Sequence, residues 1–211
     1  MDRQQILGAL AKIQAVITDS HLVYTSGKHG ATYFNKDAIY PHTELTSQLC
    51  EEIAKYFADR GIEVVIAPAV GGIILSQWVA YHLTKITGRE VLGVYAEKDG
   101  EGFVIKRGYD KLSAGKKVLI VEDILTTGGS VKKVIDTARS IGANIVGLGV
   151  LCNRGGITAK DVSNPPELFA LIDVNFDAWD EADCPLCAKN IPINMDVGHG
   201  RNYVQAKSQN K

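Results

Sequence analysis

The apolar residues of the chain follow two spacings, and each spacing predicts a different kind of element. Over residues 1–18 they recur at three- and four-residue steps, which predicts one amphipathic helix. Over residues 21–36 they alternate with polar residues around a turn at 26–30, which predicts a hairpin of two short strands. A second amphipathic helix is expected over residues 43–60, with Gly61 as its stop.

From residue 64 onward the pattern becomes strand, turn and helix, repeated. Apolar runs predict buried strands, and the three- and four-residue spacing between them predicts helices. The expected strands are 64–67, 91–96, 118–121, 145–151 and 168–174. Strands that alternate with helices imply an α/β fold with a parallel twisted sheet flanked by helices. A chain of 211 residues is long enough for one such domain with a small appendage.

Charge and composition argue against several classes of protein. The formal net charge is -1 and 22% of the residues are charged, so the chain offers no broad basic surface for nucleic acid. The apolar runs are too short to span a bilayer, and the N-terminus lacks a basic leader region. We therefore expect a cytoplasmic protein that binds neither nucleic acid nor membrane. The four cysteines are too few for a disulfide framework, and Cys50 and Cys152 lie in apolar stretches typical of core thiols.

The most informative segment is 118–130, in which a buried strand runs into a helix. Its turn combines hydroxyl donors, two glycines that permit close approach of a ligand, and the free amides of a helix start. These groups predict a site for a phosphate monoester. The carboxylates of Glu122 and Asp123 come at the end of the strand, where they suit ribose hydroxyls or a magnesium-bound sugar. An ordinary turn with an N-cap serine is the alternative. The turn consists of Thr126, Thr127, Gly128, Gly129 and Ser130.

This segment closely resembles the signature of the type I phosphoribosyltransferases, which bind phosphoribosyl pyrophosphate (PRPP). The resemblance implies their fold, assigns the turn to the 5-phosphate, and makes Glu122 and Asp123 catalytic residues that hold the ribose. A second turn between a strand and a helix matches the pyrophosphate loop of these enzymes, although alone it would be interpreted as a simple tight turn. That turn consists of Ala69, Val70, Gly71 and Gly72.

Residues 98–108 lie where these enzymes carry a mobile basic flap. The stretch is polar, holds three glycines and includes a short expected strand at 103–105. The transition state resembles a ribosyl oxocarbenium ion, so cations that arrive with the flap neutralise the departing pyrophosphate and exclude water. Solvated hairpin charges are an equal alternative for each cation. The candidates are Lys98, which we also expect to be catalytic, Lys106 and Arg107.

Other parts of the chain resemble the orotate phosphoribosyltransferases, in which an N-terminal helix and hairpin form a hood over the base. The resemblance is carried by residues 24–30, 33–36 and 153–156, and by a tail at 184–192 seen in one branch of the family. It implies that orotate is bound by Phe34, Lys28, Thr126 and Arg154.

Arg154 also suits this role on chemical grounds, because a guanidinium can bind both oxygens of a carboxylate. A salt bridge at the end of a strand is the alternative for this residue. The chain departs from the family pattern at Thr25, where many orotate enzymes have a lysine, and in the flap, which lacks their lysine-histidine pair.

The resemblance implies transfer of the 5-phosphoribosyl group from PRPP to orotate, which gives orotidine 5-monophosphate and pyrophosphate in pyrimidine (UMP) biosynthesis. It also implies Mg²⁺ as cofactor, bound mainly through PRPP, and a homodimer with shared active sites. The expected divisions are a hood at 1–42, a PRPP-binding core at 43–165, and a strand and tail at 166–211 that pack on both. A purine-type phosphoribosyltransferase and a PRPP-sensing regulator on the same fold are the alternatives.

Cys184 and Cys187 form a single Cys-x-x-Cys in the tail, which could be half of a zinc site with His199 nearby. Structural zinc needs four ligands, and the tail offers three. An unmetallated pair of thiols is therefore the expectation from sequence. A thioredoxin-like role is disfavoured because that motif begins a helix after a strand.

Overall fold

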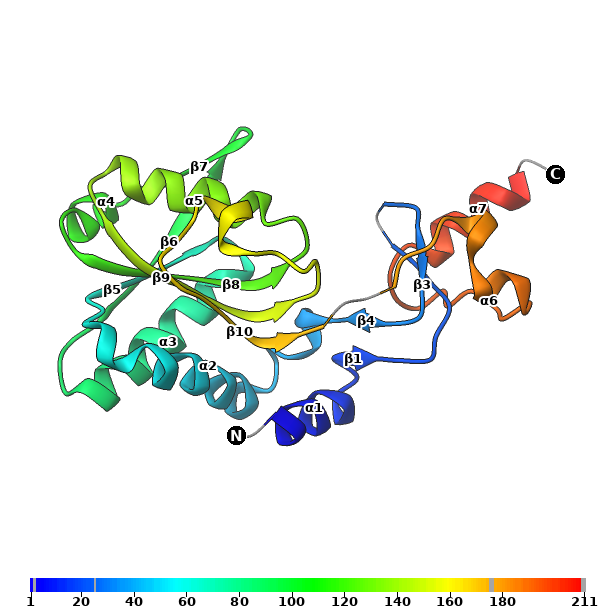
Figure 1. Cartoon of the computed structure of the whole chain (residues 1–211), viewed down its shortest axis with the longest axis horizontal. Coiled ribbons are helices and arrows are strands. Elements are labelled where there is room, and N and C mark those ends of the chain that lie inside the picture. The colour runs from blue at the N-terminus through cyan, green and yellow to red at the C-terminus, as the bar shows by residue number, and fades with distance from the viewer. Residues whose placement is uncertain (2, 25, 175–176, 210–211) are drawn as a thin grey trace. The chain divides into compact units, whose positions relative to one another are not determined.

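The computed structural model describes residues 1, 3–24, 26–174 and 177–209, and it divides the chain into two compact units (Figure 1). The first unit comprises Met1–Ile6 and His42–Asn175, and the second comprises Leu7–Pro41 and Phe176–Lys211. Within the described part of the chain, no helix combines the length and the apolar character needed to cross a membrane.

The first unit is built on a six-stranded sheet with the order β10-β9-β8-β5-β6-β7. Neighbouring strands are parallel except for β7, which runs antiparallel to β6. The expected parallel α/β sheet is thus confirmed, although β8 and β9 each continue beyond the apolar runs that predicted them. The strands are β5 (Val64–Pro68), β6 (Leu92–Asp99), β7 (Gly102–Val104), β8 (Lys117–Leu125), β9 (Asn144–Asn153) and β10 (Leu168–Asp173).

Helices cover both faces of this sheet: α2 and α3 lie on one face and α5 on the other (Figure 1). Consecutive side chains of β8 point to opposite faces of the sheet, so both faces carry apolar residues that helices can cover. Ile120 packs with Val134 of α5 on one face. Val121 lies on the other face, where it borders Gly149 together with Ile53 of α2. The helices are α2 (Thr43–Phe57), α3 (Gly71–Thr87), α4 (Tyr109–Ser113) and α5 (Gly129–Ser140), with short 3₁₀ turns at Ala58–Arg60 and Ala159–Val162.

The order of the strands places a change of direction between β5 and β8. These strands are neighbours, but β5 leads through α3 to β6 on one side, while β8 leads through α5 to β9 on the other. In open α/β sheets, ligands bind at such a switch point, outside the carboxyl ends of the strands. The fold therefore indicates a binding crevice at the ends of β5 and β8.

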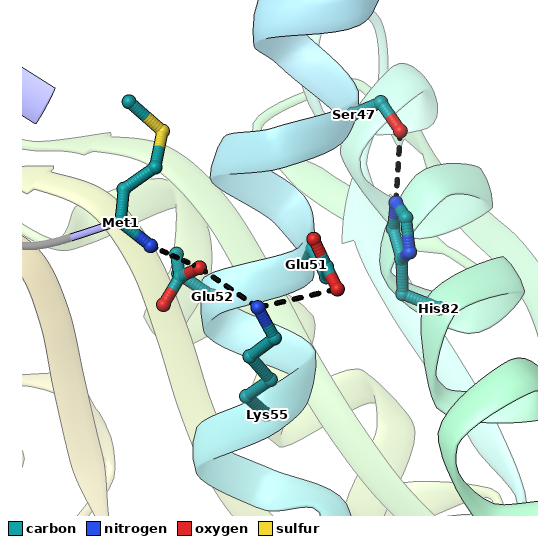
Figure 2. Close-up of polar contacts among 6 residues, drawn as sticks. All are labelled: Met1, Ser47, Glu51, Glu52, Lys55 and His82. Carbon is teal, nitrogen blue, oxygen red and sulfur yellow. Dashed lines mark hydrogen bonds and ion pairs between the residues drawn. The ribbon is translucent and has the colours of Figure 1, made fainter.

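Polar contacts join α2 to its surroundings within the first unit (Figure 2). Ser47 Oγ lies 2.9 Å from His82 Nε2 of α3, which links the two helices. On the same helix, Lys55 Nζ lies 3.1 Å from a carboxylate oxygen of Glu52 and 3.2 Å from one of Glu51. The α-amino group of Met1 forms a 2.5 Å ion pair with Glu52. His82 is thus part of the packing between helices.

The second unit contains two small antiparallel pairs, β1 with β4 and β2 with β3. The C-terminal tail closes on the hairpin, because the backbones of His29 and Trp179 exchange two hydrogen bonds of 2.8 Å. The elements outside the first unit's sheet layers are α1 (Arg3–Lys12), β1 (Val16–Ile17), β2 (Leu22–Val23), β3 (His29–Gly30), β4 (Tyr33–Phe34), α6 (Pro185–Ala188) and α7 (Gly200–Gln209), with 3₁₀ turns at Lys36–Ala38 and Glu181–Asp183.

The single helix expected over residues 1–18 is wrong in extent, because α1 ends at Lys12. Gln14 adopts a left-handed conformation with φ of 55°, and its N–H donates to the carbonyl of Ala11. The N–H of Ala15 donates to the carbonyl of Leu10 at 2.9 Å, which completes a Schellman-type helix end. Since glutamine rather than glycine occupies the left-handed position, no glycine marks the end of this helix in the sequence. The chain then enters β1.

Candidate functional site

The turn between β8 and α5 has the geometry of an anion site. Gly128 precedes the helix with φ of 71°, and a Cβ at this position would lie 2.4 Å from Cγ1 of Val162, so only glycine fits. Gly128, at the N-cap of α5, has no side chain to cap the helix, and the N–H of Gly129 makes only a long 3.5 Å hydrogen bond to Thr127 Oγ1. A ligand could therefore compete for the first amides of the helix. Thr126, Thr127 and Ser130 are exposed around it. The arrangement suits a phosphate group.

Glu122 and Asp123 lie in β8 shortly before this turn, and both are nearly buried, with exposures of 8% and 6%. Glu122 Oε1 accepts a 2.9 Å hydrogen bond from the backbone N–H of Asp123, and Asp123 Oδ1 accepts one of 2.7 Å from Ile124. Because consecutive strand residues alternate, Glu122 projects toward the α5 face, and Asp123 toward the face covered by α2 and α3. The side chains of the two acids thus lie on opposite faces of the sheet near the carboxyl end of β8.

A second turn, between β5 and α3, lies beside the first at the same edge of the sheet. The peptide between Ala69 and Val70 is cis, and Val70 is 82% exposed. No side chain caps the start of α3 at Gly71. A Cβ on Gly72 would lie 2.7 Å from Cβ of Ala67, so the close packing of helix on strand requires glycine. Two helix starts therefore follow the ends of the neighbouring strands β5 and β8.

Arg154 is positioned against the first turn by a closed loop after β9. The side-chain amide of Asn153 donates to the carbonyl of Ile157 at 2.9 Å and accepts from its N–H at 3.0 Å, which closes the loop. The N–H of Arg154 donates to the carbonyl of Leu125 at 3.0 Å. Arg154 Nε then donates to Thr126 Oγ1 at 2.8 Å. The guanidinium and the phosphate-type turn consequently share one end of the sheet.

The flap, residues 98–108, begins as a hairpin of β6 and β7 in which Lys98 is opposite Phe103. Two of its cations are held by acids of the same hairpin: Lys106 lies 4.0 Å from Asp99, and Arg107 Nε donates to Glu97. The Glu97 carboxylate raises the pKa of Arg107 above its ordinary value. Lys98 is exposed and forms no ion pair with another described residue. It is therefore the flap cation most available to an anionic ligand.

The tip of this hairpin rests on α5. Lys133 Nζ donates to the carbonyl of Glu101, and Thr137 Oγ1 donates to the carbonyl of Phe103 at 3.2 Å. Phe103 and Tyr109 pack against the hydrophobic core beneath α5. Any movement of the flap must break these contacts.

Two residues expected to bind orotate, Phe34 and Lys28, belong to the second unit. Phe34 is buried at 2% exposure and pairs with Val16, while Lys28 Nζ lies 3.5 Å from Asp180. Their contacts with a base stay a prediction. Thr25, where the family pattern is broken, lies outside the described residues. The remaining site residues, including Arg154, lie in the first unit around its crevice or on the flap.

The structure also assembles residues that the sequence did not combine. His21 and His29, from the hairpin, lie against Cys184 and Cys187, and His199 is not one of the group. His21 and His29 are eight residues apart within the expected hairpin, and this spacing was the signal in the sequence that the two histidines could lie close together. The other two cysteines are core thiols as expected, and burial raises the pKa of Cys50 and of Cys152 to about 12.

Comparison with known proteins identifies the family of the chain. The model of the phosphoribosyl transferase domain matches residues 36–183. The orotate phosphoribosyltransferase of Desulforamulus reducens is 36% identical over 192 residues, which cover 91% of this chain and 95% of that protein.

Solved structures of low sequence identity share the fold. The orotate phosphoribosyltransferase of Mycobacterium tuberculosis H37Rv superposes with a TM-score of 0.65 at 17% identity, over 82% of this chain and 97% of that one. The adenine phosphoribosyltransferase of Thermoanaerobacter pseudethanolicus gives 0.59 at 19% identity, over 79% and 99%. The fold alone therefore does not choose the acceptor base, whereas the full-length sequence similarity does choose a family. The chain belongs to the orotate phosphoribosyltransferase family.

Proposed function

We propose that the chain transfers the 5-phosphoribosyl group of PRPP to orotate, forming orotidine 5-monophosphate and pyrophosphate. The observation that carries this proposal is the pair of uncapped helix starts on either side of the switch point, with two nearly buried acids between them. PRPP needs two phosphate sites flanking one ribose, which is the arrangement at the ends of β5 and β8.

In this account the turn at Thr126–Ser130 binds the 5-phosphate through backbone amides and hydroxyls. Glu122 and Asp123 hold the ribose from opposite sides of β8, and their negative charge stabilises the cation that develops at the anomeric carbon. Both carboxylates are fixed by backbone N–H groups, so they are oriented before the substrate arrives. Because the two carboxylates are already oriented, they do not have to rearrange during the reaction.

The carboxylate oxygens at this edge also suit Mg²⁺, which prefers hard oxygen ligands and retains water and phosphate ligands. We propose that Glu122 and Asp123 face a magnesium ion bound mainly through PRPP. When bound, the ion neutralises charge on the pyrophosphate as it leaves.

The turn at Ala69–Gly72 receives the pyrophosphate at the start of α3. Lys98 supplies a cation from the flap, and Lys106 and Arg107 add theirs when the ligand competes with Asp99 and Glu97. Closure of the flap over the pyrophosphate excludes water that would otherwise capture the ribosyl cation.

Arg154 binds the carboxylate of orotate in this account. Its Nε is hydrogen-bonded to Thr126, which orients the planar group while its two terminal nitrogens remain for a carboxylate. In this position Arg154 would hold the acceptor base next to the ribose. It favours orotate over the purine bases, because the purine bases carry no carboxylate. A PRPP-sensing regulator is disfavoured by the net charge of -1.

We further propose a cytoplasmic homodimer with shared active sites, in which the flap reaches the neighbouring subunit. The support for it is the exposed position of Lys98 at the hairpin and the family to which the chain belongs.

The test is PRPP-dependent loss of orotate absorbance in the purified chain with Mg²⁺, run beside hypoxanthine, xanthine, adenine and uracil. Orotate should be consumed and the other bases should not. Consumption of a purine with orotate untouched would transfer the proposal to the purine class, and no reaction with any base would favour the regulator.

A further inference from the structure

We propose that His21, His29, Cys184 and Cys187 form a structural zinc site within the second unit. Their ligand atoms all lie within 4.8 Å of one another. Two sulfurs and two imidazole nitrogens are a ligand set typical of structural zinc. The site is separate from the magnesium chemistry of the crevice and does not depend on the proposed function.

The distances between ligand atoms approach those of a tetrahedral site. With Zn–S bonds of about 2.3 Å and Zn–N bonds of about 2.0–2.1 Å, a tetrahedron separates sulfur and nitrogen by roughly 3.6 Å. Nε2 of His21 lies 3.7 Å from Sγ of Cys184 and 3.6 Å from Sγ of Cys187. Nδ1 of His29 lies 3.3 Å from Sγ of Cys187.

The two nitrogens, His21 Nε2 and His29 Nδ1, lie 2.8 Å apart, which is a hydrogen-bond distance. A tetrahedral zinc ion would separate them by roughly 3.3 Å. A shift of about half an ångström between the two imidazoles would bring this pair to the tetrahedral separation.

A further contact orients His21 for metal binding. Its Nδ1 lies 2.6 Å from the carbonyl oxygen of Ile191 and donates to it. This bond fixes the tautomer in which Nε2 carries the lone pair, and it directs that lone pair toward the two sulfurs. Zinc-bound histidines commonly have such a second partner.

His29 is held by packing instead. Its side chain is fully buried, Nε2 has no hydrogen-bond partner among the described residues, and the ring meets Tyr203 at 83° with centroids 5.1 Å apart. Its Nδ1 is the atom that faces the other ligands.

Burial separates this group from a chance surface cluster. His21 and Cys184 are each 2% exposed, and Cys187 is partly buried. Burial removes two imidazoles and a thiol from water, which costs free energy. Coordination to a metal ion would compensate for the loss of their hydration.

The site would also serve a structural need. The second unit is small and is made of two segments far apart in sequence, so its apolar core is limited. Zinc would join the hairpin that carries His21 and His29 to the tail that carries Cys184 and Cys187. Binding energy of this kind adds directly to folding stability.

The experiment begins with the full chain, expressed in zinc-supplemented medium and purified without chelators, and measures its zinc content by mass spectrometry of the elements. About one zinc ion per chain is expected. The Cys184→Ser and His29→Gln variants should lose most of this zinc. His199→Gln is the matched control, because it changes the histidine nearest to the two cysteines in the sequence, which is outside the group, and it should retain wild-type zinc.

A second measurement covers the case in which the ligand variants fail to fold. Alkylation of the wild-type chain, mapped by peptide mass spectrometry, should spare Cys184 and Cys187 until a chelator is added, and zinc should restore their protection. Cys50 and Cys152 should stay unmodified throughout because of their burial. Zinc content at the level of the ligand variants, reactivity that a chelator does not change, or a Cys184–Cys187 disulfide in the fresh protein would overturn the proposal.

Discussion

Arg154 Nε donates a 2.8 Å hydrogen bond to Thr126 Oγ1, so the guanidinium is fixed to the first residue of the phosphate-type turn. The backbone reinforces this contact. A Cβ on Gly155 would lie 2.0 Å from the carbonyl oxygen of Thr126, and so the two loops approach as closely as glycine permits. In the proposed function, the same pair of loops would therefore position both the acceptor base and the 5-phosphate.

We predict that Arg154→Ala weakens orotate binding far more than PRPP binding. The carboxylate loses a bidentate partner, and a charge-assisted contact of this kind contributes roughly 1.5 to 3 kcal/mol. Isothermal titration with each ligand separately would measure both effects. Arg154→Lys is the control. Lysine keeps the positive charge but cannot donate two parallel hydrogen bonds to the carboxylate, so it should recover only part of the affinity for orotate. Unchanged orotate affinity with weakened PRPP would assign the arginine to the phosphates instead.

The variants Glu122→Gln and Asp123→Asn should each lose about one to three powers of ten in turnover, on the scale of one preorganised electrostatic contact. Each substitution removes a negative charge beside the ribose while keeping the side chain's shape. Circular dichroism and thermal melting should show that the fold survives. Wild-type turnover in the double variant would remove the acids from the mechanism.

The flap and the homodimer can be tested together. Asp123→Asn and Lys98→Ala chains should each be strongly impaired, but a mixture of the two should be more active than either parent after subunit exchange. One site of the hybrid would then combine intact acids with an intact flap from the other subunit. Lys116→Ala, which changes an exposed lysine paired with Glu63 outside the flap, is the control partner for the kinetics of Lys98→Ala.

The hybrid has one contradicting outcome. If mass spectrometry verifies the exchange of subunits and the mixture is no more active than its parents, the flap acts within its own chain or Lys98 is only a surface charge.

Stability should fall at acid pH partly through His82. Burial, with a smaller contribution from Lys55, holds the pKa of this imidazole below its ordinary value, against the opposing effects of Glu51 and Ser47. Between the folded pKa and the unfolded value of about 6.5, the unfolded chain binds more protons, so stability declines as pH falls through that window. His82→Gln should therefore show a smaller loss between pH 7 and pH 5 in urea unfolding. A pH profile in His82→Gln identical to that of the wild type would contradict the assignment.

Much of the first unit could be predicted because its signals are local. The apolar run at 118–121 and the helical spacing after Ser130 define β8 and α5, and the glycine needed at the left-handed position of the turn is present as Gly128. The alternation of strands and helices then predicts a parallel sheet, in which the turns that follow the strands lie at one edge. The order of the strands was not predicted.

The second unit was harder to predict because its structure depends on pairings between distant segments. Val16–Ile17 forms a strand only by pairing with Tyr33–Phe34, and a glutamine in the left-handed conformation ends the preceding helix. The grouping of His21 with Cys184 spans 163 residues. No local spacing encodes such a contact.

The most direct test of the account is the stoichiometry of the reaction. Purified chain with Mg²⁺, PRPP and orotate would be followed by phosphorus NMR, and the nucleotide product would be identified by mass spectrometry. The account predicts one orotidine 5-monophosphate and one pyrophosphate for each PRPP consumed, and almost no turnover in a folded Glu122→Gln, Asp123→Asn double variant. Release of pyrophosphate without formation of the nucleotide, or equal turnover in the double variant, would contradict it.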